Sequence, residues 1–577
     1  MAHGVDRRDT TDRRIARWLV VLVGCVYALT TGGHLYSIDE STTLETTRAL
    51  VHGERALERA PDLDGALVTS QWRRGEDVGV YGIGNAVAAA PAYGAAQLLG
   101  GSLPAGEREL LTRLFVVWVN SVIGALTAAL LYLLSRLLGA TRQWALLITV
   151  AGAFGTMVWP QAGTFWTETG TAALVLWAIY LALRSSVERR PRLVIGVGAT
   201  LGVALLFRLT AALFIPFIGA HAVLSGSGGG RGERWWRFRC LLWGAVPPLA
   251  ALGVVNWWRY GSPFHTGYAE VRYDTPLIRG LQGLVVSPGR SVLLYAPPLL
   301  ASLSALVVAG RRRWRDVLLL ALPMVVSVVY FTRFTDWEGG FSWGPRYLVP
   351  AILPLVAAAA LVARPPRWLW RTMVITTVLG VLGPGLLGVS VYFNAVYGAT
   401  FSEVAAAGGR DATNPEDVNG IIDRYSFVLR SSPLILHARH LPEALRMTAR
   451  RIDGRDSSIT GPAPTDRREL LHYNERPIQL DMWWAWWSAA GAPAAVLLVA
   501  PILAVGAGLA GWRIGRAVRG PPDGLGAARD VAPAGRSVEV TGGVREARPS
   551  RAGARPSIRR SRRRPEVQSR STPPGCC

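Results

Sequence analysis

The sequence contains no lysine, so all 62 of its basic residues are arginines. It has only four cysteines in 577 residues, and only 18% of its residues are charged. The cysteines form no disulfide framework, because two lie in or beside apolar blocks and two end the chain: Cys25, Cys240, Cys576 and Cys577. Low charge combined with 50% hydrophobic residues is rare in soluble domains and predicts a membrane protein.

The formal net charge of +23 does not indicate a nucleic-acid partner. The sequence lacks a basic patch interleaved with aromatic residues, which is the usual pattern of such proteins. The arginines instead gather between apolar blocks, as the positive-inside rule predicts for cytoplasmic loops. A basic set made of arginine alone is typical of a GC-rich bacterial genome, because arginine codons contain more G and C than lysine codons.

Several apolar blocks of about 17 to 23 residues are long enough to cross a hydrocarbon core of about 30 Å. The arginine-rich residues 1–17 predict a cytoplasmic amino terminus, followed by a first span from Trp18 to Leu35. Counting spans between the basic loops gives about twelve and returns the carboxyl end to the cytoplasm. We therefore expect an all-α polytopic protein of the plasma membrane, with both termini cytoplasmic and external juxtamembrane helices.

The span count makes further predictions. Residues Leu193–Leu224 would form a single helix of about 48 Å, so we expect a hairpin of two short helices turning near Arg208. The apolar stretch Ile83–Gly101 cannot cross without breaking the count and is expected to lie along the outer interface. The expected domains are a membrane domain (18–393), an external loop or cap (394–485), a last transmembrane helix (486–511) and a disordered basic tail (512–577).

Two acidic residues, Asp39 and Glu40, follow the first span directly. After Ser41, the residues Thr42–Glu45 fit a capping box that opens an amphipathic helix. A helix start favours ionised carboxylates, which can take a proton from an attacking hydroxyl or hold a divalent metal ion. Acidic residues are also common at helix starts for structural reasons, so the sequence leaves both interpretations open.

A further acid, Glu168, lies at the outer tip of a predicted hairpin. Placing a carboxylate in the bilayer costs up to about 3 kcal/mol, which favours a functional role. Arg208 is predicted at the same depth, either as the partner of Glu168 in a structural ion pair or as a ligand for an anion.

Two external segments, Ser287–Ser291 and Asp336–Leu348, each place an arginine just outside a span, against the positive-inside tendency. Arginines suit a phosphate, and the neighbouring aromatic residues suit sugar rings, although interfacial aromatic belts are common. With Arg208, the candidate substrate-binding residues are His265, Tyr268, Arg290, Trp337, Glu338, Arg346 and Tyr347.

Together, the acidic pair after the first span, the external amphipathic helix, the second acid and the many spans resemble the GT-C glycosyltransferases. The nearest patterns are the protein O-mannosyltransferase-like and lipid A aminoarabinose transferase-like enzymes. The stretches Ser287–Arg290 and Trp337–Tyr347 are similar to stretches of actinobacterial members. The resemblance covers roughly residues 18–393.

The resemblance implies a GT-C-like bundle of about 12 transmembrane helices that moves a sugar from a polyprenyl-phosphate donor to an extracytoplasmic acceptor. The acceptor would be an envelope glycan, a lipoglycan or a protein. Asp39 and Glu40 would match the family's catalytic acid and its neighbour, and Glu168 its second acid, where relatives often have Asp. Asp39 acting as a base would give inversion, and Arg290 and Arg346 would stabilise the departing phosphate.

A transporter or flippase of a lipid-linked or small anionic substrate is the alternative. Transporters usually place ionisable groups near the bilayer midplane and have repeated halves with broken helices. Here the charged groups gather at the outer ends of spans, and no internal repeat is evident. A scaffold or lipid-binding subunit is a third possibility, which a large separation between Asp39 and Glu168 would favour.

Overall fold

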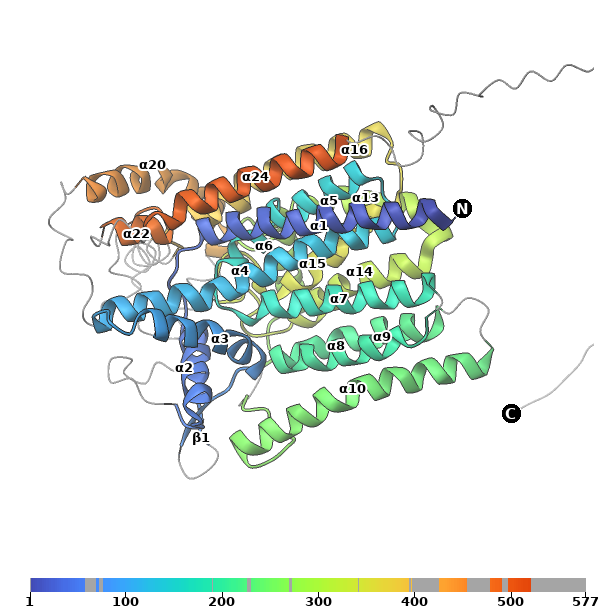
Figure 1. The fold of residues 1–577 in the computed structure, drawn as a ribbon, viewed down its shortest axis with the longest axis horizontal. Coiled ribbons are helices and arrows are strands. Elements are labelled where there is room, and N and C mark those ends of the chain that lie inside the picture. The colour runs from blue at the N-terminus through green and yellow to red at the C-terminus, as the bar shows by residue number, and fades with distance from the viewer. Residues whose placement is uncertain are drawn as a thin grey trace, which may run out of the picture. The chain divides into compact units, whose positions relative to one another are not determined.

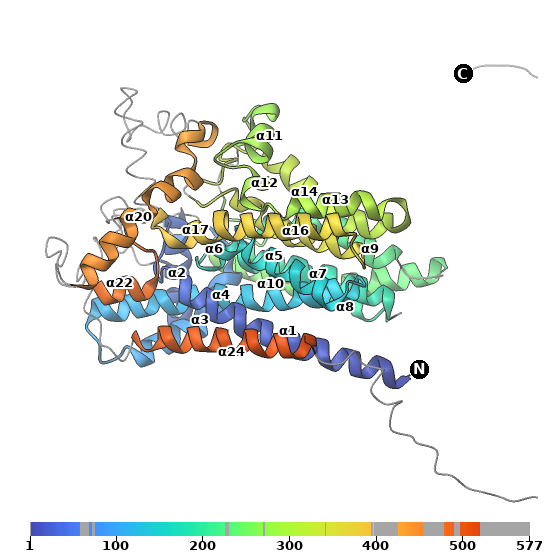
Figure 2. The same cartoon turned by 90° about the horizontal axis from the view of Figure 1, so that it is seen from above.

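The computed structural model describes residues 2–57, 69–71, 76–188, 190–225, 230–268, 272–340, 342–393, 396, 425–453, 478–489 and 497–519. These residues form a bundle of long helices that run side by side in one general direction (Figures 1 and 2). Within the described ranges, the one sheet is an antiparallel pair of short strands, β1 (Thr69–Gln71) and β2 (Asp77–Gly79).

Five described helical segments are long and apolar enough to cross a membrane: α4 (Ala105–Leu137), α7 (Thr167–Val187), α10 (Arg231–Tyr260), α14 (Trp314–Phe331) and the continuous run Arg367–Ser390. That run consists of α16 (Arg367–Gly380), a π-helical turn (Val381–Gly385) and α17 (Leu386–Ser390). Shorter apolar helices lie beside them, namely α8 (Leu193–Phe207), α9 (Ile215–Leu224), α11 (Leu277–Val286), α13 (Leu299–Ala309) and α15 (Val349–Ala357). The predicted all-α polytopic class is confirmed.

Further described α-helices are α1 (Ala2–Thr30), α5 (Arg142–Phe154), α6 (Val158–Ala162), α12 (Val292–Tyr295), α20 (Pro433–Ile452), α22 (Trp483–Ala489) and α24 (Val499–Arg519). The helix α1 packs along α4 and α24, so the first and last described helices are neighbours (Figure 2). α1 ends five residues before the predicted end of the first span. α24 extends beyond the predicted boundary at 512, and residues 520–577 of the predicted tail lie outside the described residues.

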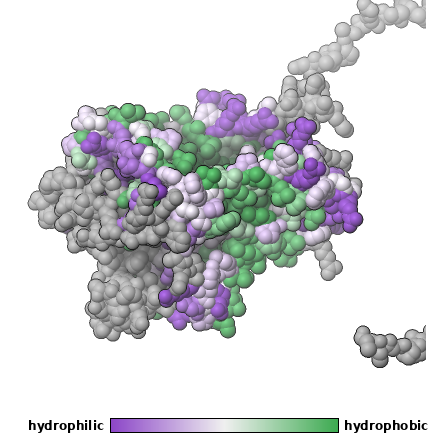
Figure 3. Space-filling model, turned by 90° about the horizontal axis from the view of Figure 1, so that it is seen from below, coloured by the Kyte–Doolittle hydropathy of each residue, from purple (hydrophilic) through white to green (hydrophobic). Residues whose placement is uncertain are grey.

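The surface agrees with a bilayer environment. One face carries a broad hydrophobic area in its middle and hydrophilic residues toward both ends (Figure 3). On α10, large apolar side chains such as Trp243 (71% exposed) and Val254 (63% exposed) point away from the protein. Exposed apolar surface of this extent suits lipid contact rather than water.

The expected hairpin between Leu193 and Leu224 is confirmed. Arg208, between α8 and the 3₁₀ helix Leu209–Phe214, contacts Glu168 at the start of α7. His221 in α9 instead lines a cavity together with Val187 at the end of α7. The helix α8 therefore runs back along α7 toward Glu168, and α9 returns to the other end of α7.

Two helices lie at the end of the bundle that carries Asp39, here called the Asp39 end. The helix α2 (Ile38–His52) is steeply inclined to the long helices (Figure 1). The helix α3 (Ile83–Leu99) packs on α2 and on α4 through apolar side chains such as Leu44, Tyr93 and Val116. α3 covers the stretch predicted to lie along the interface, and that placement stays a prediction.

Candidate active site

The start of α2 places two neighbouring acids, Asp39 and Glu40, in different surroundings. Ser37 is the N-cap residue, and Glu40 is the third helical residue of a capping box. The Glu40 carboxylate accepts backbone N–H groups from Tyr36 (2.5 Å), Ser37 (3.0 Å) and, across the chain, Phe165 (2.5 Å). The predicted box at Thr42–Glu45 is wrong, because the helix begins at residue 38 and the Thr42 hydroxyl donates to the Ile38 carbonyl.

Glu40 is therefore an anchor that ties the start of α2 to the loop before Glu168. Its side chain is fully buried. Burial raises the pKa of Glu40 to about 7, while the N–H groups of Phe165 and Tyr36 act in the opposite direction by stabilising the carboxylate. A group held in this way is poorly placed to reach a substrate.

Asp39 lies beside Glu40, and its side chain remains 27% exposed. It accepts a hydrogen bond from the Tyr81 hydroxyl at 2.5 Å, and its Oδ2 lies 2.8 Å from Nη2 of Arg346. Burial alone would raise the pKa of Asp39, but Arg346 and the Tyr81 hydroxyl outweigh it, so the pKa lies below its ordinary value. Asp39 is thus an ionised and accessible carboxylate at neutral pH.

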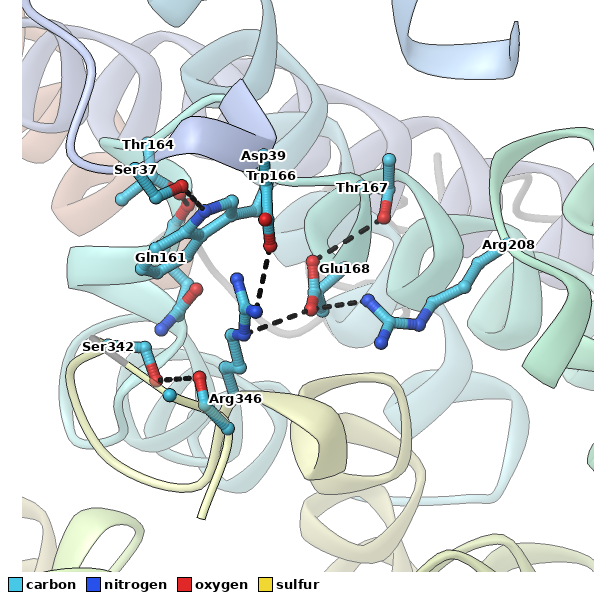
Figure 4. A network of polar contacts seen from close by, with 12 residues as sticks. Ser37, Asp39, Gln161, Thr164, Trp166, Thr167, Glu168, Arg208, Ser342 and Arg346 are labelled. Carbon is cyan, nitrogen blue, oxygen red and sulfur yellow. Dashed lines mark hydrogen bonds and ion pairs between the residues drawn. The ribbon is translucent and has the colours of Figure 1, made fainter. Parts of the chain in front are cut away.

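The second acid, Glu168, begins α7, and its side chain is only 2% exposed. Its Oε1 lies 2.5 Å from Nη1 of Arg208 and 3.9 Å from Nε of Arg346. Arg346 therefore links the two acids, and the charges alternate in the order Asp39, Arg346, Glu168 and Arg208 (Figure 4). We call these four residues the charge chain.

Aromatic rings enclose the two arginines. The guanidinium carbon of Arg346 lies 4.9 Å from the Trp166 ring centroid and 5.3 Å from that of Tyr347. The guanidinium carbon of Arg208 lies 4.9 Å from the Tyr347 ring centroid, so this tyrosine contacts both cations. Trp166 is fixed in turn by its indole N–H, which donates to Ser37 Oγ at 2.7 Å. Cation–π contacts of this kind stabilise the arginines while leaving donor groups available for an anion.

Buried polar side chains hold the backbone before Glu168, a feature that the sequence interpretation missed. Asn120 donates to the carbonyls of Thr164 (2.8 Å) and Trp166 (2.7 Å), and Asn85 donates to that of Phe165 (2.7 Å). The hydroxyls of Ser121 and Thr31 bind the carbonyls of Ala162 and Gly163. Two asparagines in otherwise apolar helices were the available signal, since a buried amide needs hydrogen-bond partners.

Arg290 lies in a different setting from the one predicted for a phosphate ligand. It is fully buried, and its guanidinium donates to the carbonyls of Ser342, Gly344 (3.1 Å) and Gly340 (2.9 Å). The loop that it binds leads directly into Arg346 and turns through glycines with positive φ at 339, 340 and 344. This geometry gives Arg290 a positioning role toward Arg346, and direct phosphate binding stays a prediction.

The remaining candidates lie around or away from the charge chain. The ring centroid of Tyr268 lies 6.4 Å from that of Tyr81, and burial raises the pKa of Tyr268 to about 12. His265 packs edge-on against Tyr260. Trp337 (3% exposed) packs against Phe427, and Glu338 is 5% exposed. The structure therefore brings together Asp39, Glu168, Arg208, Arg346, Tyr347 and Tyr268, whereas the contacts described for Arg290 and Trp337 lie elsewhere.

A buried carboxylate far along the chain, that of Asp481, supports the start of α2. Asp481 is 2% exposed and accepts hydrogen bonds from the Tyr36 hydroxyl (2.7 Å) and the Trp486 indole (3.1 Å). Its Oδ1 also lies 2.7 Å from His34 Nε2. Burial would raise the pKa of Asp481, but His34 and the Tyr36 hydroxyl lower it below its ordinary value. Asp481 thus positions the start of α2, and the external placement predicted for residues 394–485 stays a prediction.

The described residues do not form a metal site. Among them, no group of three or more His, Cys, Asp or Glu side chains is arranged to hold a metal ion. The carboxylates that were candidates for a divalent metal are engaged by other partners: Asp39 by Tyr81 and Arg346, Glu40 by backbone N–H groups and Glu168 by Arg208.

Comparison with known proteins adds a distant likeness. No family model matches the chain, and no curated protein matches it. One solved structure with a similar arrangement is ArnT from Cupriavidus metallidurans bound to undecaprenyl phosphate, with a TM-score of 0.44 and 15% sequence identity. The match covers 86% of this chain and 87% of that chain. Similarity at this level assigns neither family nor activity, so function must be inferred from the side chains.

Proposed function

We propose that this protein is a membrane glycosyltransferase that moves a sugar from a polyprenyl-phosphate donor to an extracytoplasmic acceptor. The observation that carries the proposal is the charge chain, in which an exposed, ionised Asp39 lies 2.8 Å from the Arg346 guanidinium. A base for the acceptor hydroxyl and a cation for the departing phosphate are the two groups that such a transfer requires.

Asp39 and Arg346 neutralise each other in the described arrangement, so substrate must separate them. A donor phosphate offers Arg346 a second bidentate partner, and its binding draws the guanidinium away from Asp39. The freed carboxylate then takes the proton of the acceptor hydroxyl. The acceptor oxygen forms a bond to the anomeric carbon while the bond from that carbon to the phosphate oxygen breaks, and the phosphate leaves as an anion.

The other residues of the site have supporting roles in this proposal. Arg208 holds Glu168, and the Glu168 carboxylate in turn faces Nε of Arg346. This contact orients Arg346 and keeps its charge in the site while its Nη groups change partner. Glu168 is therefore a positioning residue rather than a base, because its carboxylate is buried and paired.

A transporter is the rival function. A large separation between Asp39 and Glu168 would have favoured a scaffold. The two acids are instead close together, because Arg346 contacts both. A transporter would also use paired charges, but it would require no nucleophile or base, so its rate would not depend on a chemical step. An envelope glycan, a lipoglycan and a protein all present a suitable acceptor hydroxyl.

The test is transfer by the purified full chain in lipid, using labelled polyprenyl-phosphate sugars and envelope acceptors. We expect Asp39→Asn to lower the transfer rate by about 10²–10⁴-fold, since it removes a general base. Asp12→Asn is the matched control, because Asp12 also accepts from a tyrosine hydroxyl (Tyr132, 2.8 Å) and an arginine (Arg136, 2.9 Å).

Two results would count against the proposal. Equal transfer by wild type and a folded Asp39→Asn variant would remove Asp39 as the base. Movement of the intact lipid-linked sugar across vesicles, without any glycosidic product, would favour the transporter.

A further inference from the structure

A second polar site lies at the opposite end of α7 from the charge chain. A cavity of about 400 Å³ is formed there by the ends of α4, α7 and α9 and the start of α14. Its polar lining includes His221, Arg312, Arg313, Arg315 and Asp316, and we call it the arginine cavity. The 21 residues of α7 span about 30 Å, so the arginine cavity and Glu168 are separated by about one hydrocarbon thickness.

Only part of the positive charge in the arginine cavity is used within the protein. Arg313 donates to the Leu138 carbonyl at 2.9 Å and pairs with Asp316 at 2.9 Å, so it compensates the carbonyl end of α4. The guanidinium groups of Arg312 and Arg315 make no hydrogen bond or ion pair with any described residue. Arg315 rests over the ring of Trp314, 5.3 Å from its centroid, which leaves its N–H groups available.

His221 provides an independent indication of a ligand. Its side chain lines the arginine cavity although the residue is only 8% exposed, and its Nε2 is buried without a hydrogen-bond partner among the described residues. A buried polar atom without a partner is unfavourable, so such an atom calls for an explanation. On turning toward the cavity, the imidazole would bring this nitrogen to an oxygen atom of a ligand, which would accept its hydrogen bond.

We propose that the arginine cavity binds the phosphate group of an anionic phospholipid. Phosphate oxygens would accept from Arg312, Arg315 and His221, and arginine is the residue best suited to such contacts. The surroundings favour a lipid over a free phosphate ion. Trp314 (54% exposed) and Val187 (64% exposed) present apolar surface beside the cavity, at the ends of apolar helices where headgroups lie.

The probes are dioleoylphosphatidylglycerol, dioleoylphosphatidylcholine and inorganic phosphate, each added to the full chain in neutral detergent, with bound lipid counted by native mass spectrometry. We expect Arg312→Gln/Arg315→Gln to weaken phosphatidylglycerol binding by about tenfold or more. Arg234→Gln/Arg239→Gln is the matched control, since both arginines are exposed on α10 and Arg239 lies 5.9 Å from the Trp236 ring centroid. This control should change binding by less than about twofold.

Two substitutions of His221 distinguish binding in the arginine cavity from binding to general surface charge. His221→Leu removes the donor without changing a guanidinium and should weaken binding several-fold, whereas His221→Gln keeps a donor and should restore most of it. Equal losses in both double-arginine variants, or no effect of His221→Leu in a folded protein, would overturn the cavity as the site. Displacement of the lipid by millimolar inorganic phosphate, or equal binding of phosphatidylcholine, would overturn the assignment to an anionic lipid.

Discussion

The ion pair between Asp39 and Arg346 can be tested by a double-mutant cycle on stability. The cycle compares Asp39→Asn, Arg346→Gln and the double variant, so that losses unrelated to the pair cancel. The two side chains are 27% and 12% exposed and their charged atoms lie 2.8 Å apart, so the pair is neither on the surface nor fully buried. We expect a coupling free energy of about 2 kcal/mol, between the 0.2–1 kcal/mol of exposed pairs and the 3–5 kcal/mol lost on breaking buried ones.

The Arg184–Glu188 pair provides the reference cycle. Its atoms lie closer, at 2.6 Å, but its side chains are 33% and 30% exposed and four residues apart at the end of α7, where Glu188 is the C-cap residue. Its expected coupling is below about 0.5 kcal/mol. If distance alone set the coupling, Arg184–Glu188 would be the stronger pair, so the comparison isolates the effect of burial.

The assay is reversible unfolding of the full chain in mixed micelles, followed by tryptophan fluorescence. A coupling near 2 kcal/mol corresponds to about thirtyfold in the unfolding equilibrium, which such an assay resolves. A coupling no larger than that of Arg184–Glu188 would refute the closed Asp39–Arg346 pair, and with it the need for substrate to separate the two groups.

Three further predictions concern the rest of the site. Glu40→Gln should lower the free energy of unfolding by about 1–3 kcal/mol, because its amide cannot accept all the N–H groups that the carboxylate accepts, and thermal unfolding would measure the loss. Arg290→Gln should lower kcat by more than tenfold, because it would displace the loop before Arg346. Arg290→Lys should restore kcat poorly, because one ammonium group cannot reach three carbonyls. An unchanged kcat would contradict the positioning role of Arg290. The pKa of Asp39 is lower in the folded protein than in the unfolded chain. The stabilisation that its ionised form provides is therefore present above its ordinary pKa and is lost as the pH falls through the folded value. The free energy of unfolding, measured at falling pH, should decline less in Asp39→Asn than in wild type.

The sequence was sufficient for the features that depend on hydropathy and chain reversal. The length of the run Leu193–Leu224 predicted a hairpin at Arg208, and the structure has one there. The sequence also predicted that Arg208 would lie at the same depth as Glu168. In the structure the two residues form an ion pair. Both predictions follow from the fixed rise of an α-helix and the fixed thickness of a bilayer.

Contacts between segments far apart in the chain could not be predicted in the same way. Arg290 and Arg346 looked alike from sequence, since each follows glycines and precedes a span. Their partners decide their roles: backbone carbonyls surround Arg290, whereas Arg346 faces Asp39 and Glu168. Tyr81 was missed for the same reason, because its contact with Asp39 joins residues 42 positions apart through no sequence pattern.

The balance of charge in the site bears on what it can bind. Two carboxylates, Asp39 and Glu168, face two guanidinium groups, Arg346 and Arg208, so the charge chain is neutral as a whole. The donor phosphate is a diester with a single negative charge, so on entering such a site it gains nothing from net charge and must gain from exchange of partners. Asp39 is the carboxylate most easily released, because it is the more exposed of the two and keeps the Tyr81 hydroxyl as a donor. In the proposed reaction, binding of the donor and activation of Asp39 as a base are therefore one event, which would keep Asp39 paired until a donor phosphate is in place.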